Sequence, residues 1–346
     1  MDVAKVAKAI KYLRNRAGYT QKDLASRLGV SDKAISKWER GLGLPDVSLL
    51  GRLSVLLDTD TDSLLAGDVI HHDMNWNGLL ILDENEYGIG PGTIVYDKPL
   101  VYYLLSYFLL VGIKQIKIIC TETDRKYIEQ EFLTENALAI SLSFGIQVFD
   151  IMKDDDFLRC NNLMVVFGKS FLYGVDQTRF FQRAMNNRDR LTVLALPKGN
   201  KEEQSVIRFD TNKKIVPSDS EGQVVTQYDY YDIPFLFCPK ELFCKLSRPS
   251  HDWYDISWLF SDQDVYIEIL DRGFVEIEMN TWEKVLETAN FVKIVQKHCG
   301  MILYCIEEVA WRRGMIQLGE MKARGEKRNH TEYGQYLLSL VRDVEK

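Results

Sequence analysis

Apolar residues in the N-terminal part of the chain repeat at intervals of three and four, which is the period of an amphipathic helix. Val6, Ile10 and Leu13 share one face of a first helix. The same spacing continues through the segments that follow. It predicts a small all-α domain over residues 1–67, with five helices at residues 3–16, 21–28, 32–40, 47–57 and 62–66.

Residue types typical of helix ends lie at the expected boundaries. Thr20, Ser31 and Asp46 each precede a predicted helix and are expected to be N-caps, and Gly29 is expected to end the second helix. In the third helix, Ile35 and Trp38 point inward. This leaves a polar, mostly cationic outer face, which suits a DNA major groove.

The pattern changes at Gly78, where compact apolar runs begin to alternate with longer helical segments. Strands are expected at 78–82, 116–120, 163–167 and 191–196, and helices at 97–111, 124–133 and 177–186. This alternation with short turns predicts a doubly wound, Rossmann-like α/β domain over residues 78–346, ending in a helical segment from about residue 281. Residues 68–77 are polar and aperiodic, so we interpret them as a linker.

Charge is unevenly distributed along the 346 residues. The first fifty contain ten Lys or Arg and five Asp or Glu, a net +5, so the remainder carries −12 of the total of −7. A basic N-terminal module on an acidic body is typical of a DNA-binding domain joined to a second function.

The cysteines and the apolar runs indicate a cytoplasmic protein. The six cysteines show neither a CxxC pair nor metal-site spacing and lie mostly among apolar residues, so buried thiols in a reducing compartment are expected. The N-terminus is charged and amphipathic, unlike a signal peptide. The longest uncharged run, Pro99–Ile113, is too short to span a bilayer, so no membrane association is expected.

The segment TQKDLASRLGVSDKAISKWERGLGLPD, Thr20–Asp46, resembles the helix-turn-helix of the Cro and lambda-repressor superfamily of bacterial regulators. The resemblance covers about residues 3–67. It implies a double-stranded DNA operator as the partner, with base contacts from the start of the recognition helix and a backbone phosphate contact from Gln21. The DNA-binding residues so implied are Gln21, Ser31, Lys33, Ala34, Ser36, Lys37 and Arg40.

Asp32 departs from that pattern, because the family often has a cation there. A carboxylate repels phosphate and accepts a hydrogen bond from cytosine, so Asp32 is expected to restrict the range of DNA sequences that the protein binds. The alternative for the whole segment is a generic helical bundle that contacts proteins.

The second part resembles the sugar-1-phosphate nucleotidyltransferases, above all the glucose-1-phosphate thymidylyltransferase type. The segments that carry this resemblance are Tyr96–Ile119, Phe167–Asp176, CIEEVAWRRGMI at Cys305–Ile316 and YGQYLLSL at Tyr333–Leu340. It implies an enzyme that joins a nucleoside triphosphate to a sugar phosphate, with a divalent metal ion held by two aspartates.

The sequence departs from this pattern at the residues that carry the chemistry. The family's GGxGTRL turn is replaced by LDENEYGIGPGT, a metal-binding Asp by Lys169 and the second metal-binding Asp by Glu278. SDSEG at Ser218–Gly222 replaces the Glu-Lys-Pro motif, and the loop that holds the base is missing between Phe149 and Leu163. A lysine does not ligate Mg²⁺, but it supplies a fixed positive charge.

We therefore expect a DNA-binding transcriptional regulator whose second domain has lost its catalytic residues. That domain would be a sensor of a sugar phosphate or nucleotide sugar, an oligomerisation body, or both, with no catalytic residue and no cofactor. The pocket candidates are Gly88, Gly90, Gly92, Lys169 and Glu278, although a lone GxGxG is more often a flexible turn. The alternative is an active, Mg²⁺-dependent sugar-1-phosphate nucleotidyltransferase with a DNA-binding domain. A homo-oligomer is expected. A dimer would place two recognition helices one DNA turn apart, about 34 Å.

Overall fold

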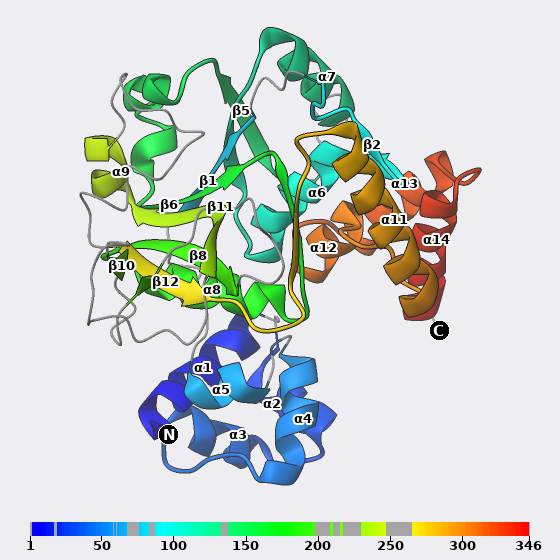
Figure 1. Cartoon of the computed structure of the whole chain (residues 1–346). Helices are drawn as coiled ribbons and strands as arrows, with labels where there is room; N and C mark the ends of the chain where they lie inside the picture. The colour runs from blue at the N-terminus through cyan, green and yellow to red at the C-terminus, as the bar shows by residue number, and fades with distance from the viewer. Residues whose placement is uncertain are drawn as a thin grey trace. The chain divides into compact units, whose positions relative to one another are not determined.

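The computed structural model describes residues 2–16, 19–57, 59, 61–67, 76–82, 87–132, 138–197, 208–209, 215–216, 230–246 and 265–345. The chain divides into two compact units, Met1–Met74 and Asn75–Lys346, and most of their helices and strands are labelled in Figure 1. Most of the predicted linker lies outside the described residues. Its last two residues, Trp76 and Asn77, are already the start of the first strand.

The first unit contains the five predicted helices, which are α1 (Val3–Arg16), α2 (Gln21–Leu28), α3 (Asp32–Glu39), α4 (Val47–Leu56) and α5 (Thr61–Ala66). Their inward faces form one apolar core that includes Ile10, Leu24, Ile35 and Trp38. The first unit thus folds as predicted, because the apolar face of each amphipathic helix packs against those of the others.

Local capping fixes where these helices begin and end. The Thr20 hydroxyl accepts from the amide of Asp23 at 3.1 Å, and the Asp23 carboxylate accepts from the amide of Thr20, a capping box. Ser31 accepts from the amide of Ala34, and Asp46 from the amide of Ser48. Gly29 has a φ of 74°, which a residue with a side chain rarely adopts. The predicted caps are therefore confirmed.

The second unit is built on a seven-stranded sheet with the order β12-β8-β11-β6-β1-β4-β5. All neighbours are parallel except β11, which is antiparallel to both β6 and β8. The strands are β1 (Trp76–Ile81), β4 (Gln115–Ile119), β5 (Ser141–Gly145), β6 (Asn162–Phe167), β8 (Leu191–Pro197), β11 (Tyr230–Pro239) and β12 (Val265–Ile269). The predicted Rossmann-like α/β class is confirmed, with one antiparallel strand inside the sheet.

Alternate residues of the central strands enter cores on opposite faces of the sheet. Leu79, Val165 and Val193 face a cluster that includes residues of two 3₁₀ helices, η1 (Val148–Lys153) and η2 (Phe157–Arg159), and of α9 (Lys240–Leu246). The other face meets α6 (Leu100–Leu110) and α8 (Gln177–Asn186). There a Cβ on Gly78 would lie 2.6 Å from the Phe108 ring, so only glycine permits this approach of α6 to β1.

The connections reverse direction between β1 and β6. From β1 the chain proceeds through α6 to β4 and through α7 (Glu122–Phe132) to β5, and then returns to the other side of β1 as β6. In an open α/β sheet, such a reversal opens a crevice at the carboxyl ends of the two strands, and ligands bind there. At this edge, β1 is followed by Leu82 and β6 by Gly168 and Lys169.

The C-terminal part consists of α11 (Trp282–Cys299), α12 (Ile306–Arg312), α13 (Leu318–Lys327) and α14 (Glu332–Glu345), which gather at one side of the second unit (Figure 1). Short ladders join β2 (Ile94–Val95) to β3 (Lys98–Pro99), β7 (Ser170–Tyr173) to β13 (Val275–Glu278), and β9 (Arg208–Phe209) to β10 (Ile215–Val216). No helix among the described residues is both long and apolar enough to cross a membrane.

Three local predictions were wrong. The helix expected from residue 97 begins at Leu100, because Tyr96 turns with a φ of 64° and residues 94–99 form the β2–β3 hairpin. Residues 170–173, for which no strand was predicted, are the strand β7. Finally, the cysteines are not all buried, since Cys299 is exposed and Cys244 is partly exposed.

Candidate functional site

The outer face of α3 carries four exposed charged side chains. Lys33, Lys37 and Arg40 are exposed together with Asp32, and none of the four forms an ion pair with the residues that the structure describes. Ala34 and Ser36 lie between them and are partly exposed. Buried Ile35 and Trp38 fix the opposite side of the helix in the core. The outer face of α3 is therefore held in a fixed orientation, carries a net positive charge and is accessible to solvent.

A buried ion pair joins the recognition helix to α1 and orients Gln21. Arg14 donates to Glu39 through Nε at 2.5 Å and Nη2 at 3.2 Å, and through Nη1 to the carbonyl of Tyr19 at 2.6 Å. The amide nitrogen of Gln21 donates to the same Glu39 carboxylate at 2.6 Å. Gln21 is thus held at the start of α2 before any ligand binds, which reduces the entropy lost on binding.

A surface hollow of about 600 Å³ lies beside this network. It is open to solvent and is lined by residues from the end of α1 and the starts of α2 and α3, namely Arg14, Asn15, Tyr19, Thr20, Gln21, Lys22 and Asp32. The N-terminus of α2 and Lys22 favour an anion, whereas the Asp32 carboxylate in the same lining opposes one.

At the carboxyl edge of the sheet, Lys169 lies two residues after Phe167, the last residue of β6, and Glu278 ends β13. The β7–β13 ladder pairs Ser170 with Glu278, and the amide of Met279 donates to the carbonyl of Lys169 at 2.7 Å. The Lys169 Nζ lies 3.3 Å from Glu278 Oε1, and the two side chains are 29% and 36% exposed. The structure therefore brings these two candidates together as an ion pair at the switch point between β1 and β6.

This pair does not fit a divalent metal ion. A lysine ammonium repels a cation, and Glu278 is already neutralised by it. Within the described ranges, no group of three or more Asp, Glu, His or Cys side chains lies close enough to hold a metal ion. The donor set differs from the two carboxylates that the resemblance implied.

The glycine-rich turn after β1 is tied to its neighbours. The amide of Gly90 donates to Thr93 Oγ1 at 3.0 Å, and a Cβ on Gly92 would lie 3.1 Å from the Tyr127 ring. The carbonyls of Thr93 and Pro91 accept from the first amides of α6. Gly88 has a φ of 69°, and among the described residues no atom lies within 4 Å of a Cβ built on it.

Lys98, another cation near this edge in sequence, is buried rather than available. Its Nζ lies 2.9 Å from Asp97 Oδ1 and 4.3 Å from the centre of the Tyr103 ring, and the side chain is 3% exposed. Burial lowers the pKa of Lys98, although the neighbouring Asp97 opposes that shift. Lys98 therefore stabilises the β2–β3 hairpin rather than serving a pocket.

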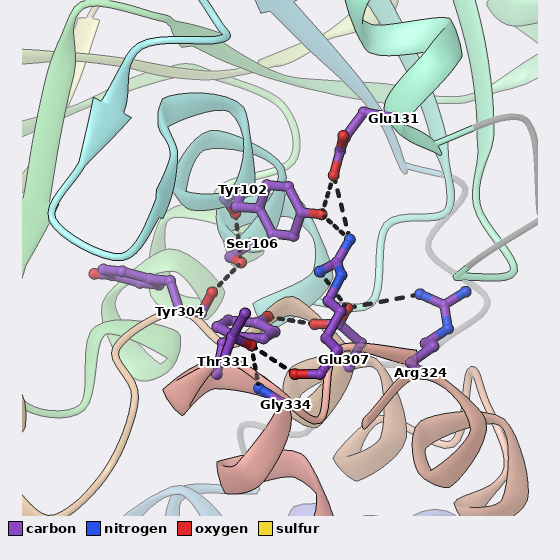
Figure 2. Close-up of polar contacts among 10 residues, drawn as sticks. Tyr102, Ser106, Glu131, Tyr304, Glu307, Arg324, Thr331 and Gly334 are labelled. Carbon is purple, nitrogen blue, oxygen red and sulfur yellow. Dashed lines mark hydrogen bonds and ion pairs between the residues drawn. The ribbon is translucent and has the colours of Figure 1, made fainter. Parts of the chain in front are cut away.

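A second polar cluster attaches α12, α13 and α14 to α6 and α7 (Figure 2). The carboxylate of Glu307, 1% exposed, accepts from the hydroxyl of Tyr333 and lies 3.6 Å from Arg328 and 3.8 Å from Arg324. Arg328 also donates to the hydroxyl of Tyr102 at 2.8 Å.

Glu131 on α7 completes this cluster. It accepts from the Tyr102 hydroxyl at 2.5 Å and lies 3.3 Å from Arg328. Burial is the main cause that raises the pKa of Tyr333, and nearby Cys305 and Glu307 add to it. The two arginines thus face two carboxylates, and the cluster satisfies its own charges. The adjacent Glu307 and Glu308 point to different partners, since Glu308 accepts from Tyr336 at 2.6 Å.

Two family models match separate parts of the chain. A helix-turn-helix model matches residues 10–64, and a nucleotidyl transferase model matches residues 91–218. The first match covers α2 and α3, and the second covers β6 and Lys169.

Similar proteins match a larger share of the chain than the second family model does. The glucose-1-phosphate thymidylyltransferase of Neisseria meningitidis serogroup A is 28% identical over 262 residues, which is 72% of this chain and 90% of the relative. The enzyme of that name from Actinoplanes sp. is 24% identical over 261 residues, 72% of this chain and 86% of the relative. A solved structure from Bacillus anthracis, described as a glucose-1-phosphate thymidylyltransferase in complex with sucrose, has the same fold, with a TM-score of 0.50 and 13% identity over 62% of this chain and 94% of that one.

Proposed function

We propose that this chain, in which a helix-turn-helix domain precedes a nucleotidyl transferase domain that resembles glucose-1-phosphate thymidylyltransferase, is a sequence-specific transcriptional regulator. Its second domain is catalytically degenerate and serves as a cytoplasmic ligand sensor, an oligomerisation body, or both. The observation that carries the proposal is a contrast between the two units. The DNA-reading helix is complete, whereas an ion pair, Lys169 with Glu278, lies where metal-binding acids are expected.

DNA recognition is supported by the placement of charge on α3. Lys33, Lys37 and Arg40 bind the groove and its phosphates, and Gln21 with Lys22 receives a phosphate in the hollow at the start of α2. Asp32 accepts from the amide of Lys33 at 2.8 Å, so its carboxylate is fixed at the tip of the helix. We expect it to favour a base that donates a hydrogen bond, such as cytosine.

Ligand sensing is supported by the position of Lys169 at the switch point. An ammonium there binds the phosphate of a sugar phosphate or nucleotide sugar by direct charge attraction, with no metal ion required. The ligand would compete with Glu278 for Lys169. Binding changes operator affinity only if the ligand has unequal affinity for the DNA-bound and free arrangements of the protein.

Selection of DNA by the purified full-length protein tests the regulator hypothesis. The protein is incubated with a randomised duplex library, bound DNA is recovered and sequenced, and the rounds are repeated. We expect enrichment of a defined motif, lost in K33A/K37A on α3 and retained in K8A/K11A, which removes the same charge from exposed positions on α1. No enriched motif after several rounds would remove the basis for the proposal.

Thermal shift with and without Mg²⁺ tests the sensor hypothesis against the enzymatic alternative. A sugar 1-phosphate or nucleotide sugar that raises the Tm without metal supports a sensor, because a ligand at 100 times its Kd adds about 2.7 kcal/mol. An active sugar-1-phosphate nucleotidyltransferase would instead release pyrophosphate from a nucleoside triphosphate and a sugar 1-phosphate with Mg²⁺. Pyrophosphate release that disappears in K169M would establish the enzyme and refute the degenerate domain.

A further inference from the structure

Trp282, the first residue of α11, links the start of that helix to the segment that follows β1. Its indole Nε1 donates to the carbonyl of Tyr87 at 3.1 Å, across 195 positions of the chain. Thr281, immediately before it, caps α11 by accepting from the amide of Lys284. The backbone of Trp282 and one edge of its ring are therefore both held in place, yet the side chain is 54% exposed.

The exposed part of this ring offers one kind of contact. The Nε1–H group is the only hydrogen-bond donor of a tryptophan side chain, and it is already bonded to Tyr87. What the ring still presents to solvent is its apolar face, which carries a partial negative charge. Such a face attracts a flat, weakly polar group or C–H bonds directed at it, and it does not attract a phosphate. A ligand that uses Trp282 must therefore contribute a ring.

Two backbone hydrogen bonds place Lys169 near this ring. The amide of Gly168 donates to the carbonyl of Ile81, the last residue of β1, at 2.8 Å. The amide of Met279 donates to the carbonyl of Lys169 at 2.7 Å. Trp282 lies three residues after Met279, which is at most about 11 Å of extended chain. The indole and the ammonium group therefore belong to the same switch point, within reach of one small ligand.

The Lys169–Glu278 pair fits a phosphate ester that has a hydroxyl group beside it. The ammonium group attracts the phosphate, whereas the carboxylate repels a phosphate and accepts from a hydroxyl. A ligand that binds Lys169 through its phosphate frees the Glu278 carboxylate to accept from the same ligand. Nζ and Oε1 lie 3.3 Å apart, so the phosphate and the hydroxyl must also be neighbours. A sugar meets this requirement where the two groups are on adjacent carbon atoms.

We propose that Trp282 is a specificity-determining residue of this site, and that its indole face stacks on the apolar face of a sugar ring. The phosphate on that ring binds Lys169, and the hydroxyl on the adjacent carbon atom donates to Glu278. The ligand is thus a hexose phosphate that carries this hydroxyl, and not a nucleotide held by its base. The inference rests on the proposed sensor function and narrows the class of its ligand.

Calorimetry of the full-length chain without Mg²⁺ tests the proposal. The probes are glucose, galactose and mannose 1-phosphate, inorganic phosphate, and uridine diphosphate as the nucleotide. At least one hexose 1-phosphate is expected to bind about tenfold more tightly than inorganic phosphate, because it adds the ring contact and the hydroxyl contact. The 2-deoxy analogue of that sugar phosphate lacks the hydroxyl beside the phosphate and is expected to bind about tenfold more weakly than its parent.

Two variants of Trp282 separate the ring face from the hydrogen bond to Tyr87. W282F and W282L both lose that bond, but only W282F keeps an aromatic face. W282L is expected to lower the affinity for the hexose 1-phosphate about tenfold and to leave the affinity for inorganic phosphate unchanged, whereas W282F keeps most of both. The control I294A truncates another apolar residue of α11, 59% exposed and about 18 Å further along the helix, and is expected to change neither affinity.

Three results would overturn the proposal. They are hexose 1-phosphates that bind no more tightly than inorganic phosphate, equal affinities for the sugar phosphate in W282F and W282L, and tighter binding of uridine diphosphate that is lost in W282L. The last result would assign the indole face to a base. K169M is expected to weaken the binding of inorganic phosphate and sugar phosphate alike, so it reports on the sensor function independently. A failure confined to the Trp282 variants leaves the proposed function in place.

Discussion

Replacement of Glu307 by glutamine tests how the C-terminal helices are attached. The side chain keeps its size and still accepts from the Tyr333 hydroxyl, but it loses its charge. Arg324 and Arg328, 17% and 37% exposed, then face an uncharged group at 3.8 and 3.6 Å. Arg328 retains Glu131 at 3.3 Å. The main cost is therefore the loss of the Glu307 charge beside two partly buried arginines.

The magnitude follows from the distances. Unit charges about 4 Å apart are worth about 4 kcal/mol at an effective dielectric constant of 20. Solvent at the two arginines reduces this, and removing one partner of a buried pair typically costs 3–5 kcal/mol. We expect E307Q to lower the free energy of unfolding of the second unit by about 3 kcal/mol.

Hydrogen exchange on peptides from α13 and α14, followed by mass spectrometry, measures this locally, and guanidinium denaturation measures it globally. Faster exchange is expected in both helices. The matched control is E326Q, the same change at an exposed position on α13, with an expected effect within about 0.5 kcal/mol. Equal exchange rates in E307Q and E326Q would refute the reasoning that the Glu307 cluster holds these helices.

Three further predictions follow from other contacts. The hydrogen bond from Lys117 lowers the pKa of Asp154 below its ordinary 3.8, so Asp154 stabilises the fold above about pH 4. D154N should lower the free energy of unfolding at pH 7 by about 2 kcal/mol, and with it the Tm. The difference in Tm between D154N and the wild type should shrink as the pH falls below 3.8, and a difference that does not change with pH contradicts this. G78A should cost about 1–3 kcal/mol by overpacking against Phe108, whereas G51A, with open space around it, should not, as measured by denaturant titration. K169M should change the free energy of unfolding by less than about 1 kcal/mol, because the partner of Lys169, Glu278, is partly exposed. It should nevertheless lower the affinity for a sugar phosphate, measured by calorimetry, about tenfold or more. Unchanged affinity would exclude Lys169 from the pocket.

The N-terminal helices were predictable because their signals are local. Thr20 and Asp23 form a capping box three residues apart, and Gly29 ends α2 within the same turn of chain. The buried strands β4, β6 and β8 were predictable from short, mostly apolar runs bounded by turns. Each of these elements can be predicted from a segment of about ten residues.

The short ladders were not predictable in this way. β7 pairs with β13, and Ser170 on β7 reaches Glu276 across 106 positions of the chain. Strand propensity depends on such partners and not on the segment alone. Sequence reasoning placed Lys169 and Glu278 in one pocket by resemblance, but their ion pair depends on this ladder.

Fluorescence anisotropy with the selected duplex and a shuffled duplex of equal composition tests the central claim most directly. Both are titrated with full-length protein near physiological salt, since affinities for DNA depend strongly on ionic strength. The account predicts that the selected duplex binds at least about 10³-fold more tightly, and that this preference disappears in K33A/K37A but not in K8A/K11A. Equal affinity for both duplexes would contradict the claim that this chain reads DNA sequence.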